Sequence, residues 1–107
     1  KSLVIGWAHV IGNTSYTAVR KTFEAAGFDV DWVADKFVAN LTSPGETPIP
    51  VNNVIGTSDK PKVVVDGKLA GACVTINGST FAPVRATFEA AGYEVEWKND
   101  GIHVRKP

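Results

Sequence analysis

The sequence predicts an α+β fold made of two ββαββ-type repeats that share an interface. The first observation is internal repetition, since residues 11–32 return as residues 76–97 with about half of the paired positions identical. The second is a change of period, because in each copy a helical spacing of apolar residues gives way to strict alternation after a glycine. A lone half would bury too little apolar surface for comfortable stability, so we expect the halves to pack together.

One short helix is expected in each copy. Val84 and Phe88 lie on one face of a helix predicted over residues 83–91. Gly92 follows directly, at the place where a left-handed residue commonly ends a helix. The equivalent helix of the first copy covers residues 18–26.

Strands are expected on both sides of each helix. In the second copy, the apolar runs at 63–65 and 72–76 predict two strands before the helix. Residues 93–98 and 102–105 alternate between apolar and polar side chains, as strands with one face on a core do. The first copy repeats this order.

The chain divides into a first repeat, residues 1–41, a connector, residues 42–61, and a second repeat, residues 62–107. Residues 42–50 of the connector hold three of the six prolines, so this stretch is expected to be extended. The first copy lacks an equivalent of the hairpin arm 63–67. We therefore expect an added strand at residues 51–55 to supply the missing edge of the first sheet.

Composition narrows the function classes. The 107 residues carry a formal net charge of zero with charges interspersed, so neither nucleic acid nor a membrane is an expected partner. No stretch approaches the roughly 18 to 20 apolar residues of a membrane span. Cys73 is the single cysteine and is predicted to pack as a small apolar residue. The chain starts at Lys1 and contains no methionine, so we expect it to be excised from a longer polypeptide.

Neither a metal site nor a catalytic site is predicted. His9 and His103 do not recur between the copies, and Cys73 has no second thiol at ligand spacing. No motif singles out a nucleophile. We expect no cofactor and no enzymatic activity from this chain alone, and a small stand-alone enzyme is the least favoured alternative.

A family resemblance follows from the run Ile-Asn-Gly-Ser-Thr-Phe-Ala-Pro-Val-Arg, the alanine-rich helix, the glycine and the aromatic-Glu-Val-Glu-Trp strand. This pattern resembles the copper amine oxidase N-terminal-like module, also called the stalk domain. The resemblance covers residues 62–106 closely and 10–41 less closely, since Ala18 stands where the second copy has Pro83. It implies a small twisted antiparallel sheet packed on one helix in each repeat, without the copper ligands or quinone cofactor of the oxidase.

The resemblance also implies a context. Such modules occur in extracellular proteins of Gram-positive bacteria and their phages, often paired and appended to cell-wall hydrolases such as N-acetylmuramoyl-L-alanine amidases. It therefore implies a non-catalytic, cell-wall-binding domain of an endolysin-type peptidoglycan hydrolase, located outside the cell or in the wall. Its partner would be a bacterial cell-wall polymer, either peptidoglycan or a secondary wall polymer. The alternative is a structural stalk or spacer, or a dimerisation domain. A dimerisation domain would have a second copy of the chain as its partner.

The tryptophans fall into two groups. Trp32 and Trp97 recur at the inward phase of the alternation and are predicted to be core residues, so removing either should cost about 3 to 5 kcal/mol. Trp7 does not recur. It is a candidate for stacking on a sugar ring, or it fills the gap left by the missing hairpin.

The other binding candidates are polar side chains near the helix starts. They offer hydroxyl and amide groups for a hydroxyl-rich ligand, or they serve as turn formers and caps. Arg20 and Arg85 are suited to anchoring a carboxylate or phosphate, or they pair with Glu24 and Glu89 four positions on. The full set of candidate ligand-binding residues is Trp7, Asn13, Ser15, Tyr16, Arg20, Asn77, Ser79, Thr80 and Arg85.

Overall fold

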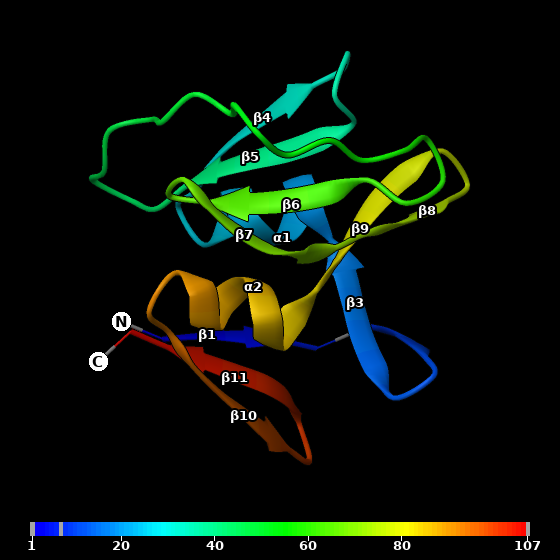
Figure 1. The fold of residues 1–107 in the computed structure, drawn as a ribbon. Helices are drawn as coiled ribbons and strands as arrows, with labels where there is room; N and C mark the ends of the chain where they lie inside the picture. Colours follow the sequence, from blue (N-terminus) through cyan, green and yellow to red (C-terminus); the bar gives the residue numbers. More distant parts are fainter. Residues whose placement is uncertain (1, 7, 107) are drawn as a thin grey trace.

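A computed structural model describes residues 2–6 and 8–106, which form two helices and three sheets (Figure 1). The α+β class is confirmed. The helices are α1 (Val19–Ala25) and α2 (Val84–Ala90). The strands in chain order are β1 (Ser2–Ile5), β2 (His9–Ile11), β3 (Thr14–Ala18), β4 (Asp29–Val33), β5 (Val38–Thr42), β6 (Lys62–Val65), β7 (Lys68–Ala72), β8 (Val74–Ile76), β9 (Ser79–Pro83), β10 (Glu94–Lys98) and β11 (Gly101–Arg105).

Both helices end in the way that the sequence predicts. Gly27 and Gly92 adopt left-handed backbone angles, with φ of 92° and 87°. The amide of the next residue then turns back to the helix, where Phe28 N donates to Phe23 O and Tyr93 N donates to Phe88 O. The predicted helices are confirmed, each one residue shorter at both ends. Neither helix in the described part of the chain is long and apolar enough to cross a membrane.

The repeats meet in the middle of a four-stranded sheet ordered β2-β3-β9-β8. Its central strands β3 and β9, one from each repeat, run antiparallel. Tyr16 pairs with Pro83, and Ala18 pairs with Phe81. Tyr16 is equivalent to Phe81 and Ala18 to Pro83, so exchanging the repeats turns one pair into the other. The register therefore places a local two-fold axis between β3 and β9.

The other two sheets contain strands exchanged between the repeats. In the sheet β4-β5-β6-β7, the second repeat's β6 runs parallel to the first repeat's β5, and β7 continues the sheet. In the sheet β1-β11-β10, the first repeat's β1 pairs antiparallel with the second repeat's β11. Figure 1 shows β1 at the N-terminus lying beside β11 at the C-terminus. The repeats thus share strands as well as an interface.

The strand expected at residues 51–55 was wrong. These residues form no strand, and the first sheet is completed by β6 and β7 instead. Pro48 and Pro50 directly precede the segment and lack the N–H groups that a ladder needs. The connector is held by a side chain, since Asn40 Nδ2 donates to Ile49 O at 3.1 Å.

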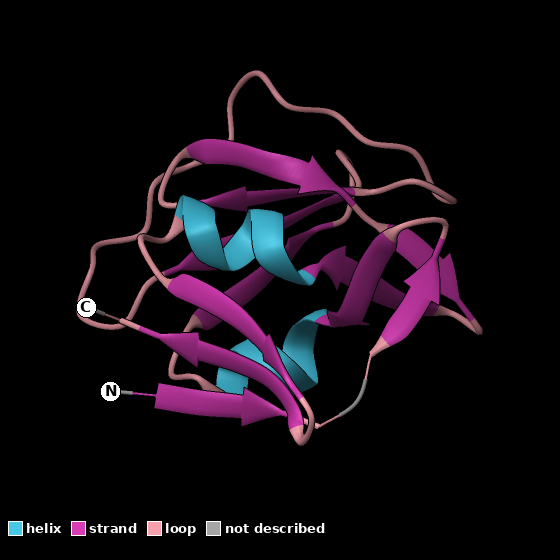
Figure 2. Ribbon diagram, turned by 90° about the horizontal axis from the view of Figure 1, so that it is seen from below, coloured by secondary structure: helices cyan, strands magenta, loops and turns pink. Residues whose placement is uncertain are grey.

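The core is centred on Phe23 and Phe88, which occupy equivalent positions in the two repeats. Their rings stack with centroids 4.5 Å apart, and both side chains are fully buried. Phe28 and Tyr93, again an equivalent pair, pack around the stack. Figure 2 shows the two helices enclosed by the strands. One hydrophobic cluster drawn from both repeats therefore holds the protein together.

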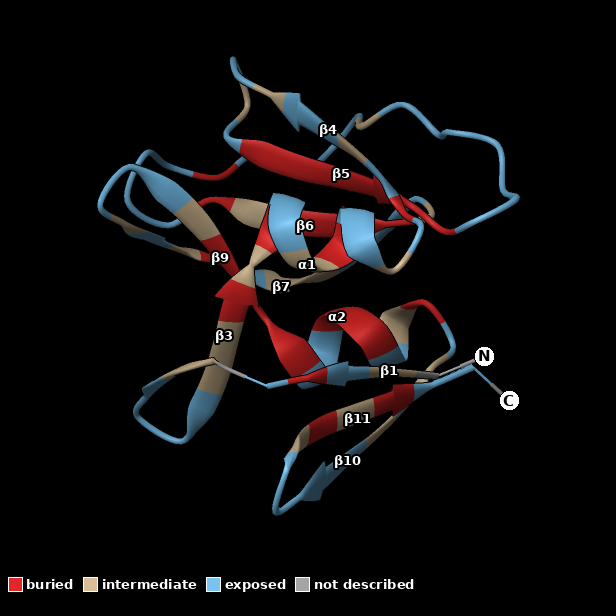
Figure 3. Ribbon diagram, turned by 180° about the vertical axis from the view of Figure 1, so that it is seen from behind, coloured by how far each residue is buried: buried red, intermediate tan, exposed pale blue. Residues whose placement is uncertain are grey.

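The prediction that Trp32 and Trp97 are core residues was wrong. Trp32 is 38% exposed and Trp97 is 49% exposed. A seven-residue helix is about 10 Å long, whereas a five-residue strand extends about 17 Å. The ends of β4 and β10 therefore reach beyond the helices that cover them, and exposed residues mark these ends in Figure 3.

Cys73 packs in the core, as predicted. Its side chain is fully buried and forms no disulfide. Burial raises the pKa of the Cys73 thiol to about 12, so the thiol stays protonated at neutral pH.

One buried hydroxyl distinguishes the repeats. In the first repeat, the Oγ1 atoms of Thr17 and Thr22 are hydrogen-bonded at 2.6 Å. The equivalent residues of the second repeat are Ala82 and Thr87, and Thr87 Oγ1 is buried with no hydrogen-bond partner among the described residues. The replacement of a threonine by Ala82 thus leaves Thr87 with an unsatisfied polar atom.

We expect Thr87→Val to raise the free energy of unfolding by about 1 kcal/mol, because it removes an unsatisfied buried hydroxyl and keeps the side-chain shape. Denaturant unfolding measures the change. The matched control is Thr22→Val, which breaks the Thr17 hydrogen bond and should destabilise. A loss of stability in both variants would show that Thr87 is satisfied in solution.

We expect Phe88→Ala to lower the free energy of unfolding by about 3 to 5 kcal/mol, because Phe88 is fully buried against Phe23. Trp97→Ala should cost clearly less, since half of its surface is already exposed. Thermal or urea unfolding of the two variants makes the comparison. An equal loss of unfolding free energy in both variants would indicate that Trp97 acts as a core residue after all.

Candidate functional site

A groove of about 610 Å³ lies on the surface beside the exposed Trp32. We call it the Trp32 groove. Residues of both repeats line it. Its walls are the β4–β5 hairpin, the start of α1, the β8–β9 turn and the end of the connector.

The hairpin wall is aromatic. Trp32 comes from β4, and Phe37 comes from the turn that joins β4 to β5. Phe37 has a φ of 53°, a left-handed conformation that is rare for an aromatic residue and costs of order 1 to 3 kcal/mol. Phe37 is 36% exposed, so this strained residue places an aromatic ring that remains partly in solvent at the groove.

The connector and the first residue of β6 hold this turn in place. Gly56 N donates to Lys36 O at 2.7 Å, and Lys62 N donates to Phe37 O at 3.0 Å. Gly56 allows this approach because a Cβ there would lie 2.5 Å from Phe37 O. The connector therefore fixes the backbone that presents the Phe37 ring.

The helix wall carries positive charge. Arg20 and Lys21 lie at the start of α1 and are exposed. Arg20 Nη1 donates to Glu24 Oε2 at 2.7 Å, which confirms the predicted pairing, and Arg85 pairs with Glu89 in the same way at 3.0 Å. A guanidinium has five N–H donors, so Arg20 keeps donors for a ligand.

The opposite wall carries hydroxyl groups. Ser79 and Thr80 begin β9, and Thr75 lies on the neighbouring strand β8. The Thr75 hydroxyl donates to Ser58 O at 2.9 Å, which ties the connector to this wall. The groove thus combines aromatic rings, hydroxyl groups and two cations.

The structure gathers three of the residues proposed from the sequence, Arg20, Ser79 and Thr80, in the Trp32 groove. Asn77 lies in the β8–β9 turn beside it, with a φ of 51°. Trp7 lies outside the described residues. The binding roles of all these residues stay predictions.

The remaining candidates lie away from the groove. Asn13 is in the turn between β2 and β3, and Ser15 and Tyr16 are on β3. Because β3 and β9 run antiparallel, the β2–β3 and β8–β9 turns lie at opposite ends of the sheet. Arg85 is on the exposed side of α2. The two sets of polar residues therefore form separate surfaces.

Sequence reasoning missed Trp32, Phe37 and Lys21 as groove residues. The alternation of β4 placed Trp32 on the inward face but did not show that the end of β4 extends beyond the helix that covers it. One signal was available for Lys21, because the equivalent position of the second repeat is Ala86. A side chain that differs between the copies at a helix start is a candidate for function.

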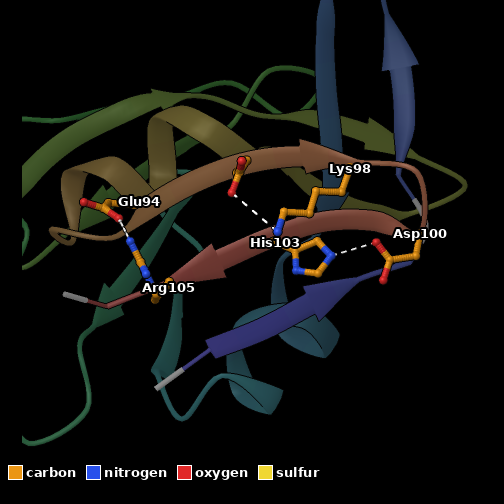
Figure 4. A network of polar contacts seen from close by, with 6 residues as sticks. Glu94, Lys98, Asp100, His103 and Arg105 are labelled. Carbon is orange, nitrogen blue, oxygen red and sulfur yellow. Dashed lines mark hydrogen bonds and ion pairs between the residues drawn. The ribbon is translucent and has the colours of Figure 1, made fainter.

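The outer face of the β10–β11 hairpin carries a second set of polar residues (Figure 4). Arg105 pairs with Glu94, and Lys98 lies 3.8 Å from Glu96. His103 Nε2 is 2.7 Å from Asp100 Oδ1, and this hydrogen bond lowers the pKa of Asp100. These charges pair with one another. Across residues 2–6 and 8–106, no group of three or more His, Cys, Asp or Glu side chains is placed to hold a metal ion.

The exchanged strands and the central phenylalanine stack define a single α+β domain built from two repeats. The family described as Copper amine oxidase N-terminal domain matches residues 6–104, and the chain belongs to this family. One match spans both repeats, in agreement with a single domain that shares its strands. The N-terminal domain of copper amine oxidases is non-catalytic. No curated protein and no solved structure matches the chain.

We expect Gly56→Ala to lower the free energy of unfolding by about 1 to 3 kcal/mol, because the added Cβ would collide with Phe37 O and Lys62 N. Urea unfolding measures the loss. The control is Gly6→Ala, where a Cβ meets nothing within 4 Å. Equal stability of the two variants would mean that the connector does not press on the Phe37 turn.

Proposed function

We propose that this domain is a non-catalytic targeting module that binds a glycan of the bacterial cell wall through the Trp32 groove. The observation that carries the proposal is the exposed Trp32 ring in a groove that also offers hydroxyl groups and cations. Small-molecule sites typically combine apolar or aromatic walls with a few polar groups that fix orientation. Sugar rings have apolar C–H faces and hydroxyl edges, which such walls complement.

The rigidity of the groove supports the proposal. The rings of Trp32 and Phe37 belong to one hairpin, and its turn is fixed by hydrogen bonds from Gly56 of the connector and Lys62 of β6. Binding then orders few side chains, which lowers the entropic cost of association. Aromatic side chains also have few rotatable bonds to immobilise.

The proposed host is an extracellular peptidoglycan hydrolase of a Gram-positive bacterium or its phage, such as an N-acetylmuramoyl-L-alanine amidase. The resemblance of the tandem repeats to modules appended to such enzymes supports this assignment. A targeting module raises the local concentration of an attached enzyme at its polymer, so weak binding by the module is sufficient.

The second candidate function is a spacer or dimerisation domain, which the family membership favours. The edge strand β2 exposes Val10 at 69% and Ile11 at 47% of their surface. An exposed apolar edge strand is a surface on which a second copy could pair. This candidate predicts no retention on cell walls and a concentration-dependent increase in mass.

We expect the chain to sediment with Gram-positive cell walls and Trp32→Ala to weaken this binding about 30-fold, as loss of a central aromatic anchor does. The matched control is Trp97→Ala, the equivalent residue of the second repeat. Binding isotherms on washed walls give the affinities, and melting temperatures show that both variants fold.

Walls stripped of their secondary polymers identify the ligand. Retention on both preparations would indicate peptidoglycan, and loss after stripping would indicate a secondary polymer. A failure of the chain to bind walls of several species would overturn the proposal in favour of a spacer. A larger loss from Trp97→Ala than from Trp32→Ala would place the site in the other repeat.

A further inference from the structure

We propose that the Trp32 groove selects acidic sugars, that is, pyranose rings of a wall glycan that carry a carboxylate. This inference rests on the function proposed above and names the chemistry of its ligand. It follows from the positive charge of the groove, from the lack of an ion-pair partner for Lys21 among the described residues, and from the contrast with the other described hollows.

The groove is cationic although the protein is neutral. Arg20 and Lys21 are the only charged side chains among the described residues that line it. The whole chain has a formal net charge of zero, so the groove carries a local excess of positive charge. Lys21 also borders a smaller hollow of about 300 Å³ beside β1, whose lining has no aromatic residue. Walls of one sign of charge raise the local concentration of ligands of the opposite sign.

Lys21 carries most of the unbalanced charge. The Arg20 guanidinium already pairs with Glu24, whereas Lys21 forms no ion pair or hydrogen bond with any described residue. An ammonium group without a partner gains a charge-assisted hydrogen bond when a carboxylate binds. The equivalent residue of the second repeat is Ala86, so the second repeat does not reproduce this charge.

Two other hollows differ in charge. One of about 510 Å³ beside β4 and β5 has Glu24, Asp29 and Asp31 in its lining, and so would repel an anion. The other, on the β10–β11 hairpin, is lined by side chains that pair with one another, including Glu94 with Arg105. Of the four hollows described, the Trp32 groove is the one that combines unbalanced positive charge with aromatic walls.

The combination of groups favours a sugar acid over a phosphate polymer. The Trp32 ring would stack on the face of a sugar ring, and the Lys21 ammonium would bind an anion in the same groove. A uronic acid supplies both within one residue, and its hydroxyl groups suit Ser79 and Thr80. A poly(glycerol phosphate) chain supplies anions but no ring.

The test is isothermal titration calorimetry of the whole chain with two oligosaccharides. One is tetragalacturonic acid, and the other is galactotetraose of the same linkage, in which hydroxymethyl groups replace the carboxylates. We expect the acid to bind about fivefold more tightly or better at low salt, as expected for partly solvated ion pairs. Added salt should reduce this difference. Lys21→Gln should weaken binding of the acid more than binding of the neutral sugar, and so reduce the preference. Lys68→Gln, at an exposed lysine on β7, is the matched control and should behave as the wild type.

Several results would overturn the inference. These are equal affinity for both oligosaccharides, an equal loss on both from Lys21→Gln, or tighter binding of poly(glycerol phosphate) than of the acid. Retention on walls without binding of either oligosaccharide would also overturn it, while the proposed function would stand. Absence of binding to walls and to both oligosaccharides would instead mean that the targeting function itself is wrong.

Discussion

The stack of Phe23 on Phe88 is the contact on which the rest of the structure depends. The two rings occupy equivalent positions of the repeats and are fully buried. Each comes from a helix of seven residues, which is too short to be stable in water without tertiary packing. By burying each other, the two rings fix both helices, and the surrounding strands of both repeats then pack on them.

Strand exchange follows from the same symmetry and makes the halves inseparable. The β4–β5 hairpin of the first repeat is extended by β6 and β7 of the second, and the β10–β11 hairpin is extended by β1 of the first. Neither repeat therefore has a complete sheet of its own. The Trp32 groove depends on this arrangement, since Trp32 belongs to the first repeat whereas Ser79 and Thr80 belong to the second. The site is a property of the pair.

The residues that the repeats share build the scaffold, and several residues of the candidate site are ones in which the repeats differ. Lys21 faces the groove where the second repeat has Ala86, and Phe37 lies in a turn longer than the one that joins β10 to β11. Some departures carry a cost, as the unsatisfied Thr87 hydroxyl opposite Ala82 shows. The strained backbone of Phe37 carries a cost as well, but there the strained residue lies at the candidate site.

The sequence by itself determined the local structure, the repeat and the family. Periodicity located both helices to within one residue, and Gly27 and Gly92 ended them because glycine adopts positive φ without strain. It also placed Cys73 in the core. Only the tertiary structure decided which strands pair, because a strand's pattern shows that it needs a partner but does not name the partner. Alternation likewise put Trp32 on the inward face of its strand. Only the packing of α1 on β4 decided that the end of the strand stays uncovered, which leaves Trp32 exposed beside the groove.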